Sequence, residues 1–170
     1  MSAALPDTVD AWRMVTARRS FEGSLPLASF KRLAPSLAAL DGDVQFELEF
    51  DRDTLGIAYV GIKAKALLPL QCQRTLETFA LPVTIDSRLG LIKREEEEAG
   101  LPEGYEPLLI GDPIINPADV IEDELILALP VVPLKPGAGS EILWSSGEEE
   151  PEEEEAPVNP FAALAQLKKS

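Results

Sequence analysis

The stretch that decides the fold is "DVQFELEFDRDTLGIAYVGIKAKALLPL", residues 43–70. Its first part alternates apolar and polar side chains, which is the period of a strand with one buried face. The sequence "RDTLG" at residues 52–56 has the composition of a turn, and the alternation resumes over residues 58–66. The apolar positions are Val44, Phe46, Leu48, Phe50, Ala58, Val60, Ile62, Ala64 and Ala66. We therefore expect two antiparallel strands joined by a short turn.

The second of these strands carries Lys63 and Lys65 on its polar face. The two lysines are expected to face the glutamates of the first strand, Glu47 and Glu49. A third strand is predicted in "LETFALPVTI", residues 76–85, where every second side chain is again apolar. Because Pro82 has no amide hydrogen, its side of this strand should lie at a sheet edge. Three such strands form a meander, and the sequence leaves open whether it curls toward a partial barrel.

A fourth strand and three short helices complete the predicted fold. The strand is expected in "YEPLLI", residues 105–110. The stretch "NPADVIEDELILALP", residues 116–130, predicts a helix with Asn116 at the N-cap and an apolar stripe that packs on the sheet. Two shorter helices are predicted near the N-terminus, one capped by Asp7 and one in "PLASFKRL", residues 26–33. The predicted class is α+β, an antiparallel meander packed with a few short helices.

This single domain is expected to span residues 1–132. Residues 133–159 are rich in Pro, Gly, Ser and Glu, so they predict a flexible acidic linker. The segment "PFAALAQLKKS", residues 160–170, predicts a short terminal helix. A helix of this length is marginal alone in water, so it should dock on its own domain or on a partner. The residues expected to make that contact are Phe161, Leu164 and Leu167.

The residue types present exclude several kinds of site. The chain has no histidine and a single cysteine, which rules out Ser-His and Cys-His catalysis and makes a zinc site improbable. No phosphate-binding loop or nucleophile motif occurs. We therefore predict a protein that is not an enzyme, with no catalytic, metal-binding or cofactor-binding residue. A hydrolase that uses Asp119 and Glu122 is the remaining enzymatic alternative.

The net charge of −15 is concentrated in the second half of the chain. Residues 1–90 carry 11 acidic and 10 basic side chains, whereas residues 91–170 carry 19 and 5. Such a half repels phosphate and attracts basic proteins, which disfavours a broad nucleic-acid-binding surface. The acidic residues of the 116–130 helix are expected to face solvent, and Glu122 and Asp123 are candidate partner contacts. Because no run of 18 apolar residues and no signal-like N-terminus occurs, a soluble cytoplasmic protein is expected, without a membrane or small-molecule partner.

Four segments carry a resemblance to a known family. They are "PLQCQRTLETF", "LPEGYEPLLI", "DVIEDELILALPVVP" and "NPFAALAQLKK". In order and spacing they resemble the bacterial YceD family, the large ribosomal RNA accumulation proteins. In that family the first segment typically reads C-x-R-C-L-E, and many members have further cysteines where this chain has "VVPLKPGAGSEILW".

This chain keeps only part of the family motif. The retained positions are Cys72, Arg74, Leu76 and Glu77, and Thr75 replaces the second cysteine. Metal binding by other members is therefore not expected here. We expect a structural hairpin between two strands, in which Cys72 is an ordinary small side chain and Arg74 pairs with Glu77 rather than with RNA.

The resemblance implies a non-catalytic factor required for accumulation of 23S ribosomal RNA and for assembly of the large ribosomal subunit. The acidic charge favours a basic ribosomal protein or a large-subunit assembly intermediate as the partner, with ribosomal RNA contacted indirectly. The alternative is an RNA-binding domain that acts on precursor ribosomal RNA through the polar face of the sheet. In that alternative Lys63, Lys65 and Arg52 supply the cations and Tyr59 stacks on bases.

Overall fold

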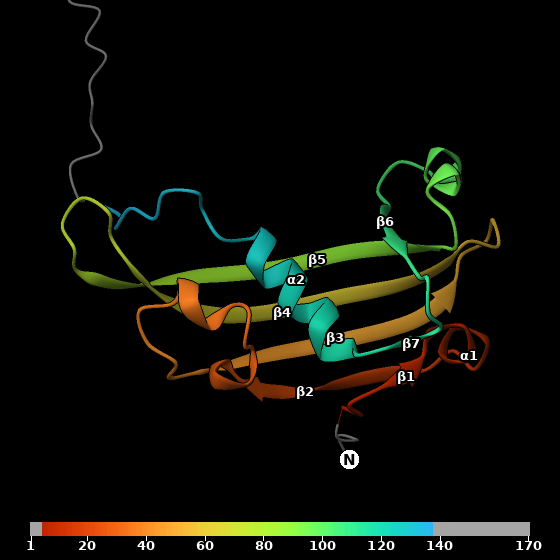
Figure 1. The fold of residues 1–170 in the computed structure, drawn as a ribbon, viewed down its shortest axis with the longest axis horizontal. Helices are drawn as coiled ribbons and strands as arrows, with labels where there is room; N and C mark the ends of the chain where they lie inside the picture. Colours follow the sequence, from red (N-terminus) through yellow and green to blue (C-terminus); the bar gives the residue numbers. More distant parts are fainter. Residues whose placement is uncertain (1–4, 138–170) are drawn as a thin grey trace, which may run out of the picture. The chain divides into compact units, whose positions relative to one another are not determined.

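A five-stranded sheet forms the centre of the fold in the computed structural model, which describes residues 5–137 (Figure 1). The strand order is β2-β3-β4-β5-β6. The strands are β2 (Ser20–Pro26), β3 (Asp43–Arg52), β4 (Ala58–Gln71), β5 (Thr78–Ile92) and β6 (Glu106–Leu109). All neighbours are antiparallel except β5 and β6, which are parallel. The edge strands β2 and β6 do not pair, so the described sheet is open and not a closed barrel, and the α+β prediction is confirmed.

Two helices and a small second sheet accompany the five strands. The helices are α1 (Ala11–Thr16) and α2 (Pro117–Leu127), and β1 (Val9–Asp10) pairs with β7 (Ile114–Ile115). Three 3₁₀ turns lie between strands: η1 (Leu27–Ser29), η2 (Ala34–Ser36) and η3 (Glu95–Gly100). Figure 1 shows α2 crossing one face of the sheet, with the η1 and η2 region beside it. No helix within residues 5–137 is both long and apolar enough to cross a bilayer.

The alternation of apolar residues in β3 and β4 places them in the core, as predicted. Val44, Phe46, Leu48 and Phe50 are all buried, and so are the apolar residues of β4 from Ala58 to Ala66. The register places Glu47 opposite Lys63, as expected. The prediction is wrong for Lys65, which lies opposite Gln45. The turn after Arg52 sets this register, because it pairs Arg52 with Ala58.

The sequence pattern also places Pro82 correctly. Strand β6 pairs only with Leu89–Ile92 of β5, so the half of β5 that contains Pro82 has no second neighbouring strand in the described part of the chain. The predicted fourth strand is present as β6. β6 runs parallel to β5 because the connection between them, which contains η3, carries the chain back to the level of Leu89 before β6 begins.

The two N-terminal helices differ from the prediction. Helix α1 is capped by Asp10, whose carboxylate accepts the Arg13 amide at 3.0 Å, and not by Asp7, because residues 9–10 are held in a strand by β7. Residues 26–33 do not form an α-helix. The 3₁₀ turn η1 replaces its first part, and the amides of Arg32 and Leu33, which a helix would use, donate to Glu122 instead.

Helix α2 matches its prediction. The side chain of Asn116 accepts the Ala118 amide at 2.9 Å, and Pro117 occupies the first turn. Its apolar stripe is buried through Val120, Ile121 and Leu125. The domain end at residue 132, the linker and the terminal helix stay predictions. Of residues 133–170, only residues 133–137 belong to the described part of the chain.

Candidate functional site

The family-motif residues form the hairpin between β4 and β5. The Cys72 amide donates to the carbonyl of Glu77 at 2.9 Å, and the Leu76 amide donates to the carbonyl of Cys72 at 2.9 Å. Leu76 has a φ of 60°, in the left-handed region that is unusual for a leucine, and its side chain is exposed. The hairpin is the structural turn that the sequence predicted.

Cys72 has a specific role in this hairpin. Its side chain is buried, and its sulfur accepts the amide of Lys135, a residue 63 positions later, at 3.4 Å. The Lys135 amide and the hydroxyl and amide of Thr75 lower the pKa of Cys72 to about 6. Within residues 5–137 no three side chains of the metal-binding types come together. The Cys72 sulfur is thus a hydrogen-bond acceptor for the chain segment that follows α2.

That segment, residues 131–135, is held at two further points. The Gln73 amide donates to the carbonyl of Pro133 at 2.9 Å, and the Lys135 ammonium pairs with Glu77 at 2.9 Å. This ammonium group holds the pKa of Glu77 below its usual range. The expected pairing of Arg74 with Glu77 stays a prediction, and the ion pair of Glu77 seen among the described residues is with Lys135. Sequence spacing carries no signal for it, because the two residues lie 58 positions apart.

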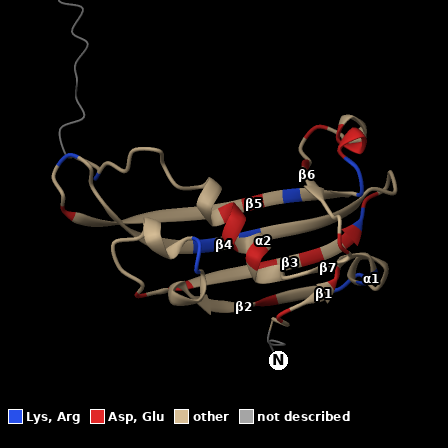
Figure 2. Ribbon diagram, in the orientation of Figure 1, with Lys and Arg blue, Asp and Glu red and all other residues tan. Residues whose placement is uncertain are grey.

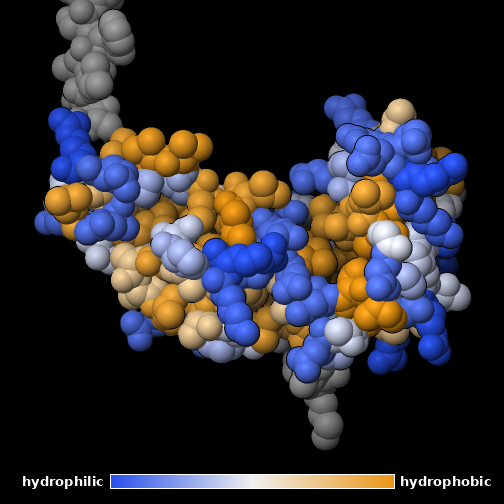
Figure 3. All heavy atoms as spheres, viewed as in Figure 1, coloured by the Kyte–Doolittle hydropathy of each residue, from blue (hydrophilic) through white to orange (hydrophobic). Residues whose placement is uncertain are grey.

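Apolar side chains are exposed at this end of the molecule. Figure 3 shows apolar surface over the segment that follows α2. The exposed apolar residues of the hairpin, of the end of α2 and of the segment that follows α2 are Leu76, Leu127, Val131, Val132 and Leu134, and we call them together the apolar patch. Val131 is fully exposed at 101%. Clustered exposed apolar residues are typical of interaction surfaces.

The acidic residues of α2 are only partly on the surface. Figure 2 shows them on the helix beside the basic residues of the η1–η2 region. Glu122 is buried, which corrects the expectation that it faces solvent. One of its oxygens accepts the amides of Arg32 at 2.6 Å and Leu33 at 3.0 Å, and the other pairs with the Arg32 guanidinium at 3.0 Å. Glu122 thus joins α2 to the η1–η2 region and has almost no surface to offer a partner.

The neighbouring acids behave differently. Asp123 is half-exposed and pairs with the same Arg32, so it remains available at the surface. Glu124 is buried and accepts the Ser87 hydroxyl of β5 at 2.6 Å, which again corrects the expected solvent exposure. A signal for burial was present in the sequence, since Glu122 lies one helical turn before Leu125 on the edge of the apolar stripe.

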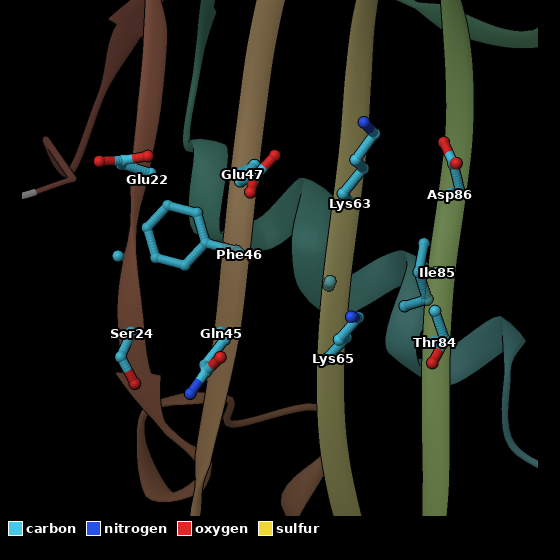
Figure 4. A pocket seen from close by; sticks show the side chains of 12 residues that line it. Glu22, Ser24, Gln45, Phe46, Glu47, Lys63, Lys65, Thr84, Ile85 and Asp86 are labelled. Carbon is cyan, nitrogen blue, oxygen red and sulfur yellow. The ribbon is translucent and has the colours of Figure 1, made fainter.

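The face of the sheet opposite α2 is not covered along most of its length. Figure 4 looks onto this face with the helix behind the strands, and we call it the open face. Its centre is a groove of about 810 Å³. One row across the strands consists of Glu22, Glu47, Lys63 and Asp86, and the next row consists of Ser24, Gln45, Lys65 and Thr84.

One end of the open face is closed by aromatic packing. Tyr59 is buried against Tyr105, with ring centroids 6.1 Å apart, and Arg88 lies over the Tyr59 ring at 5.5 Å. Burial raises the pKa of Tyr59. Arg52 donates to the carbonyl of Gly56 at 2.8 Å. Tyr59 is therefore not the exposed stacking surface that direct RNA binding was expected to use.

The predicted site residues are thus distributed over separate places. Cys72, Arg74, Leu76 and Glu77 form the hairpin, and Glu122 and Asp123 lie on α2. Phe161, Leu164 and Leu167 lie outside the described residues. Sequence reasoning missed Lys135, which completes the hairpin.

Comparison with known proteins gives one consistent result. A family model described as "Large ribosomal RNA subunit accumulation protein YceD" matches residues 60–168, a range that includes the Cys72 hairpin and α2. A protein of Haemophilus influenzae with the same description is 32% identical over 170 aligned residues, which cover 96% of this chain and 96% of that protein. No solved structure matches the chain.

Proposed function

Because the chain belongs to the YceD family of large ribosomal RNA subunit accumulation proteins, we propose that it is required for normal accumulation of 23S ribosomal RNA and for assembly of the large subunit. We further propose that it acts in the cytoplasm without catalysing a reaction, by binding a basic ribosomal protein or a large-subunit assembly intermediate. Ribosomal RNA is then contacted through that partner.

The observation that carries this mechanism is the distribution of charge. Residues 91–170 carry 19 acidic and 5 basic side chains. Ribosomal proteins that fold onto RNA are rich in lysine and arginine, so an acidic chain can neutralise them before RNA is available. The same carboxylates repel the phosphate backbone of RNA.

Direct RNA binding is less well supported. Lys63 and Lys65 lie on the open face, but Lys63 lies directly between two carboxylates, those of Glu47 and Asp86. The aromatic ring proposed for stacking, that of Tyr59, is covered by Tyr105 and Arg88. A single-strand binding surface needs accessible aromatic rings beside its cations.

A carboxylate hydrolase is also less well supported. Its proposed pair is Asp119 and Glu122, and the carboxylate of Glu122 is already occupied by two backbone amides and a guanidinium. A general acid or base must reach a substrate within hydrogen-bonding distance. Glu122 serves the packing of α2 instead, which favours a non-catalytic protein.

Apolar contacts are proposed to supplement the charge. The apolar patch offers Leu76, Val131 and Val132 to a partner, and Asp123 of α2 provides an exposed carboxylate. We propose that Phe161, Leu164 and Leu167 of the terminal segment make further contacts with the partner. If Phe161→Ala changes neither partner binding nor thermal stability, this part of the proposal is wrong.

The proposal is tested in cells and by purification. Cells that lack the protein should contain less 23S relative to 16S ribosomal RNA, and the intact gene should restore the ratio. A tagged full-length chain should then be purified from growing cells with and without ribonuclease. We expect a basic large-subunit protein to remain bound after ribonuclease treatment. An unchanged 23S level, or a complex that dissolves entirely with the RNA, would contradict the proposal.

A further inference from the structure

The open face continues beyond its groove into a second hollow, which has a volume of about 710 Å³. Four apolar side chains of β4 and β5 line it, and we call it the proline hollow: Leu67, Pro69, Ala80 and Pro82. They form two neighbouring cross-strand pairs, in which the β4 residues are Leu67 and Pro69. Both residues continue the alternation of Lys63 and Lys65 along β4, so the proline hollow belongs to the same face of the sheet.

The proline hollow is exposed although it is apolar. Leu67 is 62% exposed, and the side chains of Ala80 and Pro82 are exposed as well. A single exposed leucine needs no explanation, but these side chains are adjacent and line one hollow. Adjacent exposed apolar side chains are typical of a surface that a partner covers.

Carboxylates outnumber cations around the groove and the proline hollow. Among the described residues that line them, the exposed carboxylates are Asp41, Asp43, Glu47 and Asp86, besides Glu22, which already has an interaction partner. The cations among these lining residues are Lys63 and Lys65. Figure 4 shows Gln45, Lys65 and Thr84 on neighbouring strands, and these three residues line both hollows. The two hollows therefore form one surface, which suits a partner that combines apolar side chains with lysine or arginine.

A helix is the conformation that suits this sheet face. An extended segment on the face would leave its backbone amides and carbonyls unpaired, since the strands beneath it already pair with one another. A helix pairs its own backbone internally and presents a stripe of side chains. Lys63 and Leu67 lie four positions apart on β4, a distance of about 13 Å, which about nine helical residues span.

We propose that the proline hollow and the groove are the docking site for an amphipathic helix of the basic partner protein. The helix packs apolar side chains against Leu67 and Pro82. Its lysines or arginines lie beside Asp43 at the proline hollow and, about two turns further along, beside Glu47 in the groove. Apolar burial supplies most of the affinity, and opposite charge supplies the selection for a basic helix. This assignment rests on the proposed function, because it gives the basic partner a place on the fold.

The composition of the surface distinguishes this partner from RNA and from a second copy of the chain. RNA needs cations along its path, but Lys63 and Lys65 are outnumbered by the carboxylates beside them. A second copy carries the same excess of carboxylates, so two such faces repel each other. A basic helix meets opposite charge at the same positions.

The first experiment measures the binding of synthetic helical peptides to the full-length chain at physiological salt. One peptide of about 18 residues carries leucines on a single helical face and lysines elsewhere. The matched probe has the same composition and charge, but its leucines are spread around the helix. We expect the first peptide to bind about tenfold more tightly, because only it can bury its leucines together in the proline hollow. Equal binding of both peptides would overturn the inference, since charge alone would then explain it.

A pair of leucine variants locates the site. We expect Leu67→Thr to raise the Kd of the amphipathic peptide about tenfold, because it removes the apolar side chain but keeps a residue suited to a strand. Leu55→Thr is the matched control, since Leu55 is 73% exposed in the turn between β3 and β4, outside the face. It should leave the Kd unchanged. An unchanged thermal midpoint of both variants excludes a folding effect. If the two variants have the same Kd, the docking site is wrong.

Charge variants test the selection for a basic helix. Asp41→Asn with Asp43→Asn should raise the Kd of the amphipathic peptide about fivefold, as the loss of two exposed ion pairs implies. Lys65→Gln in the same hollow should lower the Kd, because it removes a like charge. Weaker binding by Lys65→Gln with no effect of the double variant would overturn the inference, as would a 23S RNA fragment that needs Lys65 and competes with the peptide. A wild-type dimer that Leu67→Thr dissociates would also overturn it, since a second copy would then cover the face.

A purified basic large-subunit protein separates this docking site from the proposed function. If that protein binds the wild type and Leu67→Thr with the same Kd, the docking site is wrong and the proposed function stands. If no basic large-subunit protein binds the chain, the proposed function itself fails, and the peptide titrations still decide the docking site.

Discussion

Removal of the Glu122 carboxylate is the perturbation whose effect can be worked out most completely. The carboxylate accepts the amides of Arg32 and Leu33 and pairs with the Arg32 guanidinium. In Glu122→Ala the buried Leu33 amide loses its acceptor, which costs about 1–3 kcal/mol, and the partly buried Arg32 amide adds about 1 kcal/mol. The half-exposed ion pair contributes about 0.5 kcal/mol more. We expect the free energy of unfolding to fall by about 2.5–4.5 kcal/mol in total.

The measurement is urea unfolding followed by circular dichroism of the sheet, with a constant m-value as the sign of an unchanged unfolding transition. Asp123→Ala is the matched control, because Asp123 pairs with the same Arg32 at the surface and should cost less than about 1 kcal/mol. Arg32→Ala removes the guanidinium but keeps both amides, so it should cost about 1 kcal/mol. If Glu122→Ala costs no more than either control, the proposed role of the two amides is refuted.

Three further predictions concern the hairpin and the closed end of the sheet. Folding lowers the pKa of Cys72 from its ordinary value of 9.0 to about 6. The thiolate therefore stabilises the fold fully above pH 9, and this contribution is lost as the pH falls to 6. The unfolding free energy of the wild type relative to Cys72→Ser should increase from pH 6 to pH 9 in urea titrations. Gly90→Ala should lower the unfolding free energy by about 1 kcal/mol, because a Cβ would lie 2.6 Å from Leu101, whereas Gly61→Ala, with 3.5 Å to its nearest neighbour, should cost less in the same assay. Leu76→Asn should keep or raise the thermal midpoint, since asparagine tolerates the left-handed φ of 60° better than leucine, and a lower midpoint would show that the exposed leucine packs in the fold.

The strands could be predicted because their signal is local. Val44, Phe46, Leu48 and Phe50 alternate within one short stretch, and burial of one face follows from that period alone. Helix α2 was equally accessible, since Asn116 and Pro117 are start signals and Val120, Ile121 and Leu125 form a stripe.

The contacts that the sequence could not predict join distant segments. Glu122 meets the Arg32 amide across 90 residues, and Cys72 meets the Lys135 amide across 63. Neither pair has a spacing or composition that identifies it. These long-range hydrogen bonds also explain why the predicted α-helix at residues 26–33 is absent. The amides of Arg32 and Leu33 donate to Glu122 and not to helical carbonyl groups.

In the candidate site, too, the local structure could be predicted from the sequence and the long-range contacts could not. The half motif at Cys72–Glu77 indicated a hairpin without metal ligands, and the hairpin is present. Its function as a holder of residues 131–135 became visible only with Lys135 in place. The open face required the strand order as well, since sequence alone does not say that β2 is an edge.

The central claim is that this acidic chain recognises a basic protein of the large subunit and not naked RNA. The most direct measurement compares the Kd of the full-length chain for purified basic large-subunit proteins with its Kd for protein-free 23S ribosomal RNA, both at physiological salt. We predict binding to at least one protein and no measurable binding to the RNA. Tight binding to the RNA alone, retained after the glutamates at 148–155 are replaced by glutamine, would contradict the claim.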